Sequence, residues 1–461
     1  MLPKTTVALV SLGCPKNLVD SQAMLGLLDQ AGYEVVEQVQ AADVIVVNTC
    51  AFIEPAQEEA IDALLDLAEL KEGRCRALIA AGCLVQRHGR ELLGQLPEVD
   101  AFVGVGAVPR VLQAVEGALR GEKVFLDCPL TYVYDGSTPR LHTGAAWLSY
   151  LKIADGCSNR CAFCTIPDLR GPYRSVPPHL LVQQLEQLSG QDVSEVCLIA
   201  QDTTAYGRDL SPPVALHRLL DELLAVPFSG WVRALYLYPR HLDDEVIGRL
   251  CGGPPLVPYF DIPLQHASAP LLRRMGRAGD AESYLNLLQA IRATGVDPAI
   301  RTTFIVGFPG ETDREFEELL RFVEAAAFDR LSCFRYWPEA GTRAAEMDEQ
   351  VPMELADERL DELMQLQEDI SLRHNQRFVG RELTVLLEEP IAGTELWRGR
   401  TYRDAPEVDA EIKVALGDTP EGPPGRAPQP GDFVRARVEF AEVYDLQGRM
   451  VSGPGDDKAA P

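Results

Sequence analysis

The stretch DGCSNRCAFCTIP, from Asp155 to Pro167, places three cysteines on one short loop. Cys157, Cys161 and Cys164 follow the spacing C-x3-C-x2-C. Three thiolates spaced in this way can bind three irons of a cubane and leave the fourth iron open to another ligand. A structural zinc ion is the alternative, but zinc needs a fourth ligand, and no cysteine or histidine stands at a suitable spacing nearby. The loop therefore predicts an iron–sulfur cluster with one open iron.

The cysteine loop follows the first of several apolar runs that alternate with helix-like segments. Such alternation predicts parallel strands covered by helices. Six strand–helix units in series predict a closed or partly closed barrel, in which sites lie at the carboxyl ends of the strands. We place this barrel at residues 140–378. The six runs are 147–155, 193–202, 231–239, 259–266, 299–308 and 330–338.

Residues 1–130 show the same alternation and predict a separate parallel α/β domain. Each of its three apolar runs (5–12, 43–50 and 76–83) has a cysteine at or just past its end: Cys14, Cys50 and Cys83. The carboxyl ends of parallel strands meet at one edge of a sheet, where ligand sites form. The three thiols therefore predict a second iron–sulfur cluster, again with an open iron. The alternative is that free cysteines are buried as small apolar residues.

We keep that apolar interpretation for the remaining cysteines. Cys75 precedes the apolar run at 76–83, so we expect it at the edge of the N-terminal sheet opposite to the three predicted ligands. Eleven cysteines in a cytoplasmic chain of 461 residues do not indicate a disulfide framework. The cysteines left without a predicted metal-binding role are Cys75, Cys128, Cys197, Cys251 and Cys333.

The last part of the chain has short β-like runs. Residues 379–450 predict a small antiparallel β-barrel, and residues 451–461 predict a disordered tail. The fold class is therefore α/β, with an N-terminal parallel domain, a central partial (β/α)6 barrel and a C-terminal β-barrel. No stretch of eighteen apolar residues is present, which predicts that nothing spans a membrane. The N-terminus lacks the features of a secretory signal, so we expect a cytoplasmic protein.

The charge of the chain bears on its partners. The formal net charge is −26, and residues 379–461 carry ten Lys and Arg against sixteen Asp and Glu. A β-barrel that binds RNA should be basic, because phosphate contacts supply most of the affinity. An acidic barrel predicts no strong nucleic-acid patch and suits a basic protein partner. The alternative is that the negative charge only keeps the chain in solution.

The C-x3-C-x2-C motif resembles that of the radical S-adenosylmethionine (SAM) enzymes, whose fold is a partial (β/α) barrel. This resemblance implies that the open iron binds SAM and that polar groups at the strand ends contact it. The strand end at 259–266 carries Asp261 and His266 in addition to Gln265, one of the implied SAM contacts. The alternative for each is that it only satisfies backbone groups or forms a turn. The implied SAM contacts are Gln201, Asp202, Gln265, Arg301 and Gly307.

The order of the three parts resembles the methylthiotransferases, which combine a three-cysteine domain, a radical SAM barrel and a TRAM β-barrel of OB-like form. Three stretches look like the branch that modifies an aspartate of ribosomal protein S-twelve: SLGCPKN at 11–17, IPDLRGPYRS at 166–175 and AQDTTAYG at 200–207. The tRNA branch is closer to FGCQMN around its first cysteine. tRNA adenosine 2-methylthiolation is therefore the nearest alternative, and a non-catalytic iron–sulfur or zinc RNA module is the next.

The resemblance also implies the cofactors and the course of the reaction. Two [4Fe-4S] clusters and SAM are expected, with no catalytic residue beyond the cluster ligands. The cluster on Cys157, Cys161 and Cys164 would cleave SAM to a 5′-deoxyadenosyl radical, which takes hydrogen from the β-carbon of the aspartate. The cluster on the N-terminal cysteines would hold the sulfur that is transferred. A flavodoxin or ferredoxin would supply electrons to a monomeric enzyme.

Overall fold

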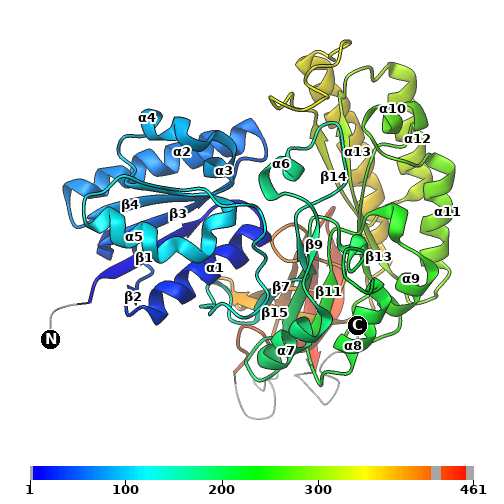
Figure 1. Cartoon of the computed structure of the whole chain (residues 1–461). Helices are drawn as coiled ribbons and strands as arrows, with labels where there is room; N and C mark the ends of the chain where they lie inside the picture. The colour runs from blue at the N-terminus through cyan, green and yellow to red at the C-terminus, as the bar shows by residue number, and fades with distance from the viewer. Residues whose placement is uncertain (1–3, 417–426, 453–461) are drawn as a thin grey trace.

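The computed structural model describes residues 4–416 and 427–452. Figure 1 shows the N-terminal α/β part, coloured blue to cyan, beside the central part, coloured green to yellow, with the orange and red strands of the C-terminal barrel near the junction. Of the predicted tail at 451–461, residues 453–461 lie outside the described residues. Residues 451 and 452 belong to strand β19. Among the described residues, no helix combines the length and apolar character needed to cross a membrane.

The N-terminal part is a parallel sheet with the strand order β2-β1-β3-β4-β5-β6. Its two central strands, β3 and β4, are buried along their whole length, because helices cover both faces of the sheet. This explains why their sequences are continuous apolar runs. The strands are β1 (Thr6–Ser11), β2 (Glu34–Val35), β3 (Val44–Thr49), β4 (Ala77–Gly82), β5 (Ala101–Val103) and β6 (Val124–Leu126). The α-helices are α1 (Pro15–Gln30), α2 (Glu54–Ala68), α3 (Cys83–His88), α4 (Leu92–Gln95) and α5 (Val111–Leu119).

The central part confirms the prediction of six parallel strands in an open barrel. The strands form two three-stranded sheets, β11-β10-β7 and β12-β13-β14. A bridge between Val232 and Leu256 connects the two sheets at one side. Among the described residues, the edge strands β7 and β14 do not pair with each other, so the barrel is partial. The strands are β7 (Leu148–Lys152), β10 (Glu195–Ile199), β11 (Trp231–Ala234), β12 (Tyr259–Gln265), β13 (Ala299–Val306) and β14 (Arg330–Arg335). The outer helices are α7 (Pro178–Ser189), α8 (Leu216–Leu224), α9 (Asp244–Leu250), α10 (Ala269–Arg274), α11 (Ala281–Arg292), α12 (Asp313–Ala326) and α13 (Met353–Gln376).

The cysteine loop lies between two very short strands, β8 (Ala154–Asp155) and β9 (Arg174–Ser175), which pair in antiparallel fashion. The short helix α6 (Ile166–Arg170) comes after the last cysteine. The loop therefore starts and ends on the same small piece of sheet, and this fixes both of its ends at the carboxyl end of β7.

The C-terminal part is a closed barrel with the strand order β15-β16-β17-β19-β18. The prediction of a small β-barrel is confirmed, although one of its pairings, β17 with β19, is parallel and the other four are antiparallel. Alternate residues of the strands fill the interior. The strands are β15 (Glu382–Pro390), β16 (Leu396–Arg400), β17 (Ile412–Ala415), β18 (Phe433–Ala441) and β19 (Leu446–Ser452).

Buried ion pairs join this barrel to the central part. The carboxylate of Glu195, at the start of β10, accepts hydrogen bonds from Arg233 Nε at 2.7 Å and from Arg400 Nη2 of β16 at 2.6 Å. All three side chains are almost fully shielded from solvent. Asp329 accepts a further bond from Arg403 Nη2 at 2.7 Å. The barrel is therefore held in place by charges that have no access to water.

We expect Glu195→Gln to destabilise the protein by about 3 kcal/mol or more, because the buried guanidinium of Arg233 loses its counter-ion and that of Arg400 keeps only its pair with Glu388. The free energy of unfolding, measured by urea denaturation, checks this.

Lowering the pH should also destabilise the protein, because it protonates Glu195. Burial raises the pKa of Glu195, but Arg400 and Arg233 lower it by more, so the net shift is downward. This stabilisation is present above the pKa of an unfolded Glu, about 4.3, and is lost as the pH falls below it.

The matched control is Glu389→Gln, which removes the same charge from an exposed pair with Arg398 on the same barrel. Exposed pairs contribute less than about 1 kcal/mol. Equal losses in the two variants would contradict the importance that we assign to burial.

Candidate functional site

The three predicted cysteines of the N-terminal part lie at the carboxyl edge of its sheet. Cys14 follows β1 and caps α1, Cys50 follows β3, and Cys83 begins α3 directly after β4. Gly13 has a φ of +90°, and a Cβ there would come within 2.8 Å of Cys50 Cβ and 3.1 Å of Cys50 Sγ. A glycine is therefore required at position 13 for the loops that carry Cys14 and Cys50 to approach each other this closely.

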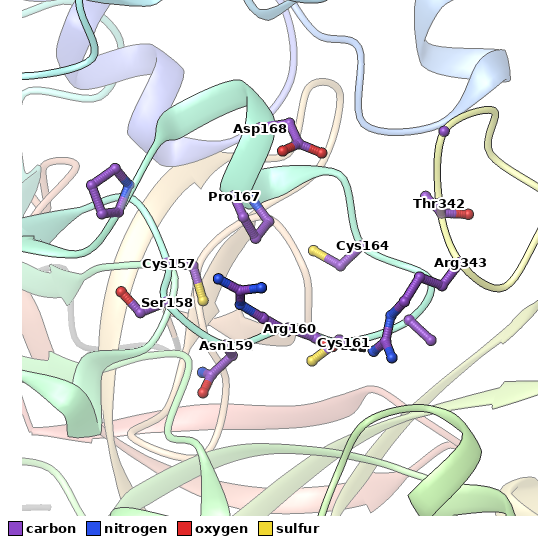
Figure 2. Close-up of a pocket in the computed structure, with 13 residues that line it drawn as sticks. Cys157, Ser158, Asn159, Arg160, Cys161, Cys164, Pro167, Asp168, Thr342 and Arg343 are labelled. Atoms are coloured by element: carbon purple, nitrogen blue, oxygen red, sulfur yellow. Dashed lines mark hydrogen bonds between the residues drawn. The ribbon is translucent and has the colours of Figure 1, made fainter.

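The cysteines of the C-x3-C-x2-C loop line a hollow of about 420 Å³. Figure 2 shows the sulfur atoms of Cys157, Cys161 and Cys164 facing a common space. Backbone hydrogen bonds hold the loop in place, including one from the amide of Ala162 to the carbonyl of Met275 at 2.8 Å. The loop is thus anchored at its middle as well as at its ends.

The two cysteine trios open onto one shared cavity. This cavity, which we call the two-trio cavity, has a volume of about 410 Å³ and lies between the N-terminal and central parts. All six predicted cysteines line it, together with apolar and aromatic side chains. Its polar and charged lining residues include Lys16, Asn17, Asn159, Arg170, Gln201, Asp261, Gln265, Arg277, Arg301 and Thr303.

The donor set fits iron–sulfur clusters better than a single ion. Thiolates are the ligands that such clusters prefer. In the described part of the chain, no three His, Cys, Asp or Glu side chains gather closely enough to hold one metal ion. Burial raises the pKa of Cys83 and of Cys164 to about 12 and that of Cys157 to about 11. These thiols bind metal only after they lose their protons, so cluster assembly must release protons here.

A buried network of charges links the two trios. Lys152 Nζ of β7 donates to Asp20 of α1 at 2.5 Å and to Asp155 at 3.1 Å. Arg170 Nη1 of α6 donates to the same two carboxylates, at 2.7 and 3.1 Å. Its other nitrogen, Nη2, donates to the side-chain oxygen of Asn17 and lies 3.8 Å from Cys83 Sγ. The network therefore connects the loop of one trio to a cysteine of the other.

Three of the predicted SAM contacts line the two-trio cavity: Gln201, Gln265 and Arg301. Gln201 Nε2 donates to Asp155 at 2.8 Å, while its buried Oε1 has no hydrogen-bond partner in the described part of the chain. Arg301 donates to Asp261 at 3.0 Å and to Asp409 at 3.1 Å, so its guanidinium is already paired. The unpartnered oxygen of Gln201 gives the cavity one acceptor that a polar ligand can use.

The other two predicted contacts, Asp202 and Gly307, are not among the residues that line this cavity. The carboxylate of Asp202 accepts hydrogen bonds from Asn159 Nδ2 at 2.7 Å and from the backbone amide of Ala205 at 3.1 Å. It therefore supports the cysteine loop. A Cβ on Gly307 would lie 2.4 Å from Cβ of Ala356 in α13. A glycine is thus needed at 307 for helix packing.

Sequence reasoning missed several residues of the cavity wall. Arg277 donates from Nη1 towards Cys161 Sγ at 3.7 Å, and its buried Nε has no partner. Lys16 is buried, and its ammonium lies 3.1 Å from the centre of the Tyr236 ring. Burial lowers the pKa of Lys16 to about 8. Tyr236 comes just after the third strand of the barrel, so the rule of strand ends could have identified it. Lys16 and Asn17 stand next to the first cysteine of the quoted motif.

Family models match consecutive parts of the chain. An uncharacterized protein family (UPF0004) matches residues 6–104, the radical SAM superfamily matches 151–323, and the TRAM domain matches 379–451. The cysteine loop at the mouth of a partial barrel agrees with the second of these matches. The fold and the site together define the class of the protein: it is a radical SAM enzyme.

Relatives along the whole chain define the family more closely. The chain is 45% identical over 459 residues to the ribosomal protein uS12 methylthiotransferase RimO of Anaeromyxobacter sp. (strain K), covering 99% of this chain and 96% of that protein. It is 43% identical over 447 residues to the RimO protein of Pelotomaculum thermopropionicum, covering 96% and 99%. It is 43% identical over 452 residues to the RimO protein of Geobacter sulfurreducens, covering 97% of this chain and 99% of that protein. The chain belongs to the ribosomal protein uS12 methylthiotransferase family.

The fold also resembles solved structures. The radical SAM methyltransferase TsrM of Kitasatospora setae, with tryptophan and a SAM analogue bound, superposes with a TM-score of 0.53 at 14% identity. The alignment covers 72% of this chain and 73% of that chain. At this identity the likeness concerns the fold alone.

We expect Gly13→Ala to reduce the iron bound by the N-terminal trio, because the added methyl group would push Cys50 away from Cys14. Iron and sulfide counts after anaerobic reconstitution check this, and we expect a loss of up to about half of the iron if each trio holds one four-iron cluster. Gly32→Ala is the matched control: its φ of +93° imposes the same backbone strain, but no atom lies within 4 Å of the added Cβ. Equal iron loss in both variants would rule out the steric explanation.

Proposed function

We propose that this chain is a radical SAM methylthiotransferase that adds a methylthio group to the β-carbon of an aspartate of ribosomal protein S-twelve (uS12). One observation carries the proposal: two separate trios of cysteines, from two parts of the fold, line a single cavity. A reaction that needs a radical at a carbon atom and a sulfur donor beside it requires this arrangement. The names of the full-length relatives support the substrate.

In this proposal, Cys157, Cys161 and Cys164 hold the cluster that binds SAM, and Cys14, Cys50 and Cys83 hold the auxiliary cluster. When bound, the two clusters and SAM supply the electron, the hydrogen-abstracting radical and the sulfur. The chain itself positions these groups and excludes water. The aromatic rings of Phe163, Tyr236 and Tyr238 in the cavity wall serve the second purpose.

Five residues are proposed to form the SAM-binding region. Gln201 and Gln265 offer amide groups to the polar parts of SAM, and Arg301 fixes Asp261 in the wall. Asp202 acts through Asn159, which it holds in the cysteine loop, and Gly307 acts by letting α13 pack closely. The unpartnered Nε of Arg277 adds a donor beside the cysteine loop.

We also propose the surroundings of the enzyme. It would work as a monomer in the cytoplasm, receive electrons from a flavodoxin or ferredoxin, and have no strong nucleic-acid patch. Its domains would span 1–130, 140–378 and 379–450. tRNA adenosine methylthiolation is the less favoured function, because residues 379–461 carry sixteen acidic against ten basic residues.

The test of the proposed function is the mass of uS12 in a strain that lacks the gene for this chain. We expect uS12 to lose the mass of one methylthio group, and the methylthio content of tRNA from the same cells to stay unchanged. A uS12 mass that is the same with and without the gene would overturn the proposal. A loss of methylthio groups from tRNA would favour the alternative function.

We expect cysteine variants to separate the two clusters. Wild-type protein should bind about eight irons after anaerobic reconstitution, and both Cys14→Ala and Cys157→Ala should bind about half as many. Cys14→Ala should still cleave SAM but form no methylthiolated product, whereas Cys157→Ala should do neither. Iron analysis and chromatography of the SAM cleavage products check this.

The matched control is Cys251→Ala, which removes a half-buried thiol from outside the cavity and should keep all the iron. Methylthiolation by Cys14→Ala at the wild-type level would show that the N-terminal trio is not a sulfur-bearing site.

A further inference from the structure

Among the described residues, the two-trio cavity contains one cation that has neither a carboxylate nor any other hydrogen-bond acceptor in contact with it. Four cationic side chains line the cavity: Lys16, Arg170, Arg277 and Arg301. Arg170 and Arg301 are paired with carboxylates, and Arg277 donates to the carbonyl of Pro263 at 2.6 Å. Within residues 4–416 and 427–452, the ammonium of Lys16 has neither a hydrogen-bond acceptor nor an ion-pair partner within reach.

Burial makes this lack of a partner significant. Lys16 is only 6% exposed, and a desolvated ammonium group without a counter-ion is costly. Its ammonium lies over the Tyr236 ring, 3.1 Å from Nζ to the ring centre. The face of an aromatic ring offsets only part of the lost hydration of a cation. The ammonium is therefore available to an anion in the cavity, which is either a cluster on the neighbouring Cys14 or an acidic group of the substrate.

The ring beneath Lys16 is rigidly held. Tyr236 has a φ of +60°, which is uncommon for a bulky residue. Two hydrogen bonds maintain this conformation: the amide of Tyr236 donates to Asp261 Oδ2 at 2.9 Å, and its carbonyl accepts from the amide of Thr203 at 3.0 Å. Backbone strain of this kind persists where the surrounding structure requires it and is concentrated at functional sites.

The position of Lys16 indicates which anion it receives. It lies on the first turn of α1, two residues after Cys14, so its ammonium faces a cavity that both trios share. The side-chain carboxylate of an aspartate is bonded directly to the β-carbon. A carboxylate held at Lys16 would therefore keep the β-carbon inside the two-trio cavity.

The geometry points to Lys16 as the group that binds the side-chain carboxylate of the target aspartate, with the Tyr236 ring as the floor of this subsite. This inference rests on the proposed function, since it specifies how that substrate is selected. Lys16 would act as a specificity-determining residue: it distinguishes an acidic side chain from a neutral one of the same shape.

The test is a comparison of equilibrium binding to the fully reconstituted enzyme. Two peptides with the target loop of uS12 are used, one with the aspartate and one with asparagine in its place. We expect Lys16→Met to weaken binding of the aspartate peptide by at least about tenfold and to change binding of the asparagine peptide much less. Lys16→Arg should retain part of the preference for aspartate, because it keeps the charge.

Two controls accompany this test. Lys4→Met makes the same substitution at an exposed position of the N-terminal part and should leave both affinities unchanged. Iron content is measured for each variant, because a lysine that only balances the charge of a cluster would lower iron loading when it is removed. If Lys16→Met loads less iron than wild type and Lys16→Arg loads the normal amount, Lys16 balances the charge of a cluster and the assignment to the substrate carboxylate is overturned.

Each outcome has a distinct meaning. Equal weakening for the two peptides, in an enzyme that still modifies uS12, would overturn the assignment of Lys16 and leave the proposed function intact. A wild-type enzyme that neither binds the aspartate peptide nor modifies uS12 would overturn the proposed function itself. Selective loss for the aspartate peptide supports the carboxylate subsite.

Discussion

The arrangement of the site depends on four buried charges between the N-terminal and central parts. Asp20 and Asp155 supply two negative charges, and Lys152 and Arg170 supply two positive ones, all within hydrogen-bond distance. Burying any one of them alone would cost several kcal/mol, so they are stable only as a set. Burial raises the pKa of Asp155, but Lys152 and Arg170 lower it by more, and the carboxyl stays ionised. Since the set draws on both parts of the chain, it also fixes how they face each other.

This charge network explains why the residues next to Cys14 are as informative as the cysteine itself. Asn17 Nδ2 donates to the carbonyls of Leu12 at 3.1 Å and of Thr49 at 3.0 Å, and so ties together the loops that carry Cys14 and Cys50. Its oxygen accepts from Arg170. Thus the start of α1 carries a thiol, a free ammonium and a brace to the central part, within four residues. These three functional groups therefore lie within a single helical turn.

Local periodicity and the geometry of parallel sheets were enough to predict much of the fold and both cysteine trios. The gathering of Cys14, Cys50 and Cys83 at one edge needs only the rule that parallel strands end together. Strands β2, β5 and β6 were not predicted, because two or three residues carry no period. The parallel pairing of β17 with β19 was not predicted either, because it depends on closure of the barrel, which no single strand reveals.

The shared cavity was beyond the reach of sequence reasoning. It exists because Asp20 meets Lys152, a contact across 132 positions that no spacing rule predicts. The strand-end rule also does not tell whether a polar residue faces the cavity or the backbone. Gln201 and Asp202 are neighbours, yet the first lines the cavity and the second caps a turn and holds Asn159. Burial and hydrogen-bond partners decide such cases, and both are properties of the folded chain.

The opposite charges of the exterior and the cavity divide the task of recognition. The chain as a whole carries a formal charge of −26, which favours approach by a basic protein. The two-trio cavity, in contrast, is lined by four cationic side chains and, among described residues, by the carboxylate of Asp261 alone. Arg170 and Arg301 are paired with carboxylates, so Lys16 and Arg277 are the cations of the lining that have no ion-pair partner within residues 4–416 and 427–452, and these two can meet an acidic group. Under the proposed function, a basic protein with an exposed acidic side chain satisfies both requirements at once, and the negative net charge disfavours the phosphates of RNA. The proposal thus assigns selection of the partner to the negative exterior and selection of the reacting side chain to the cations of the cavity.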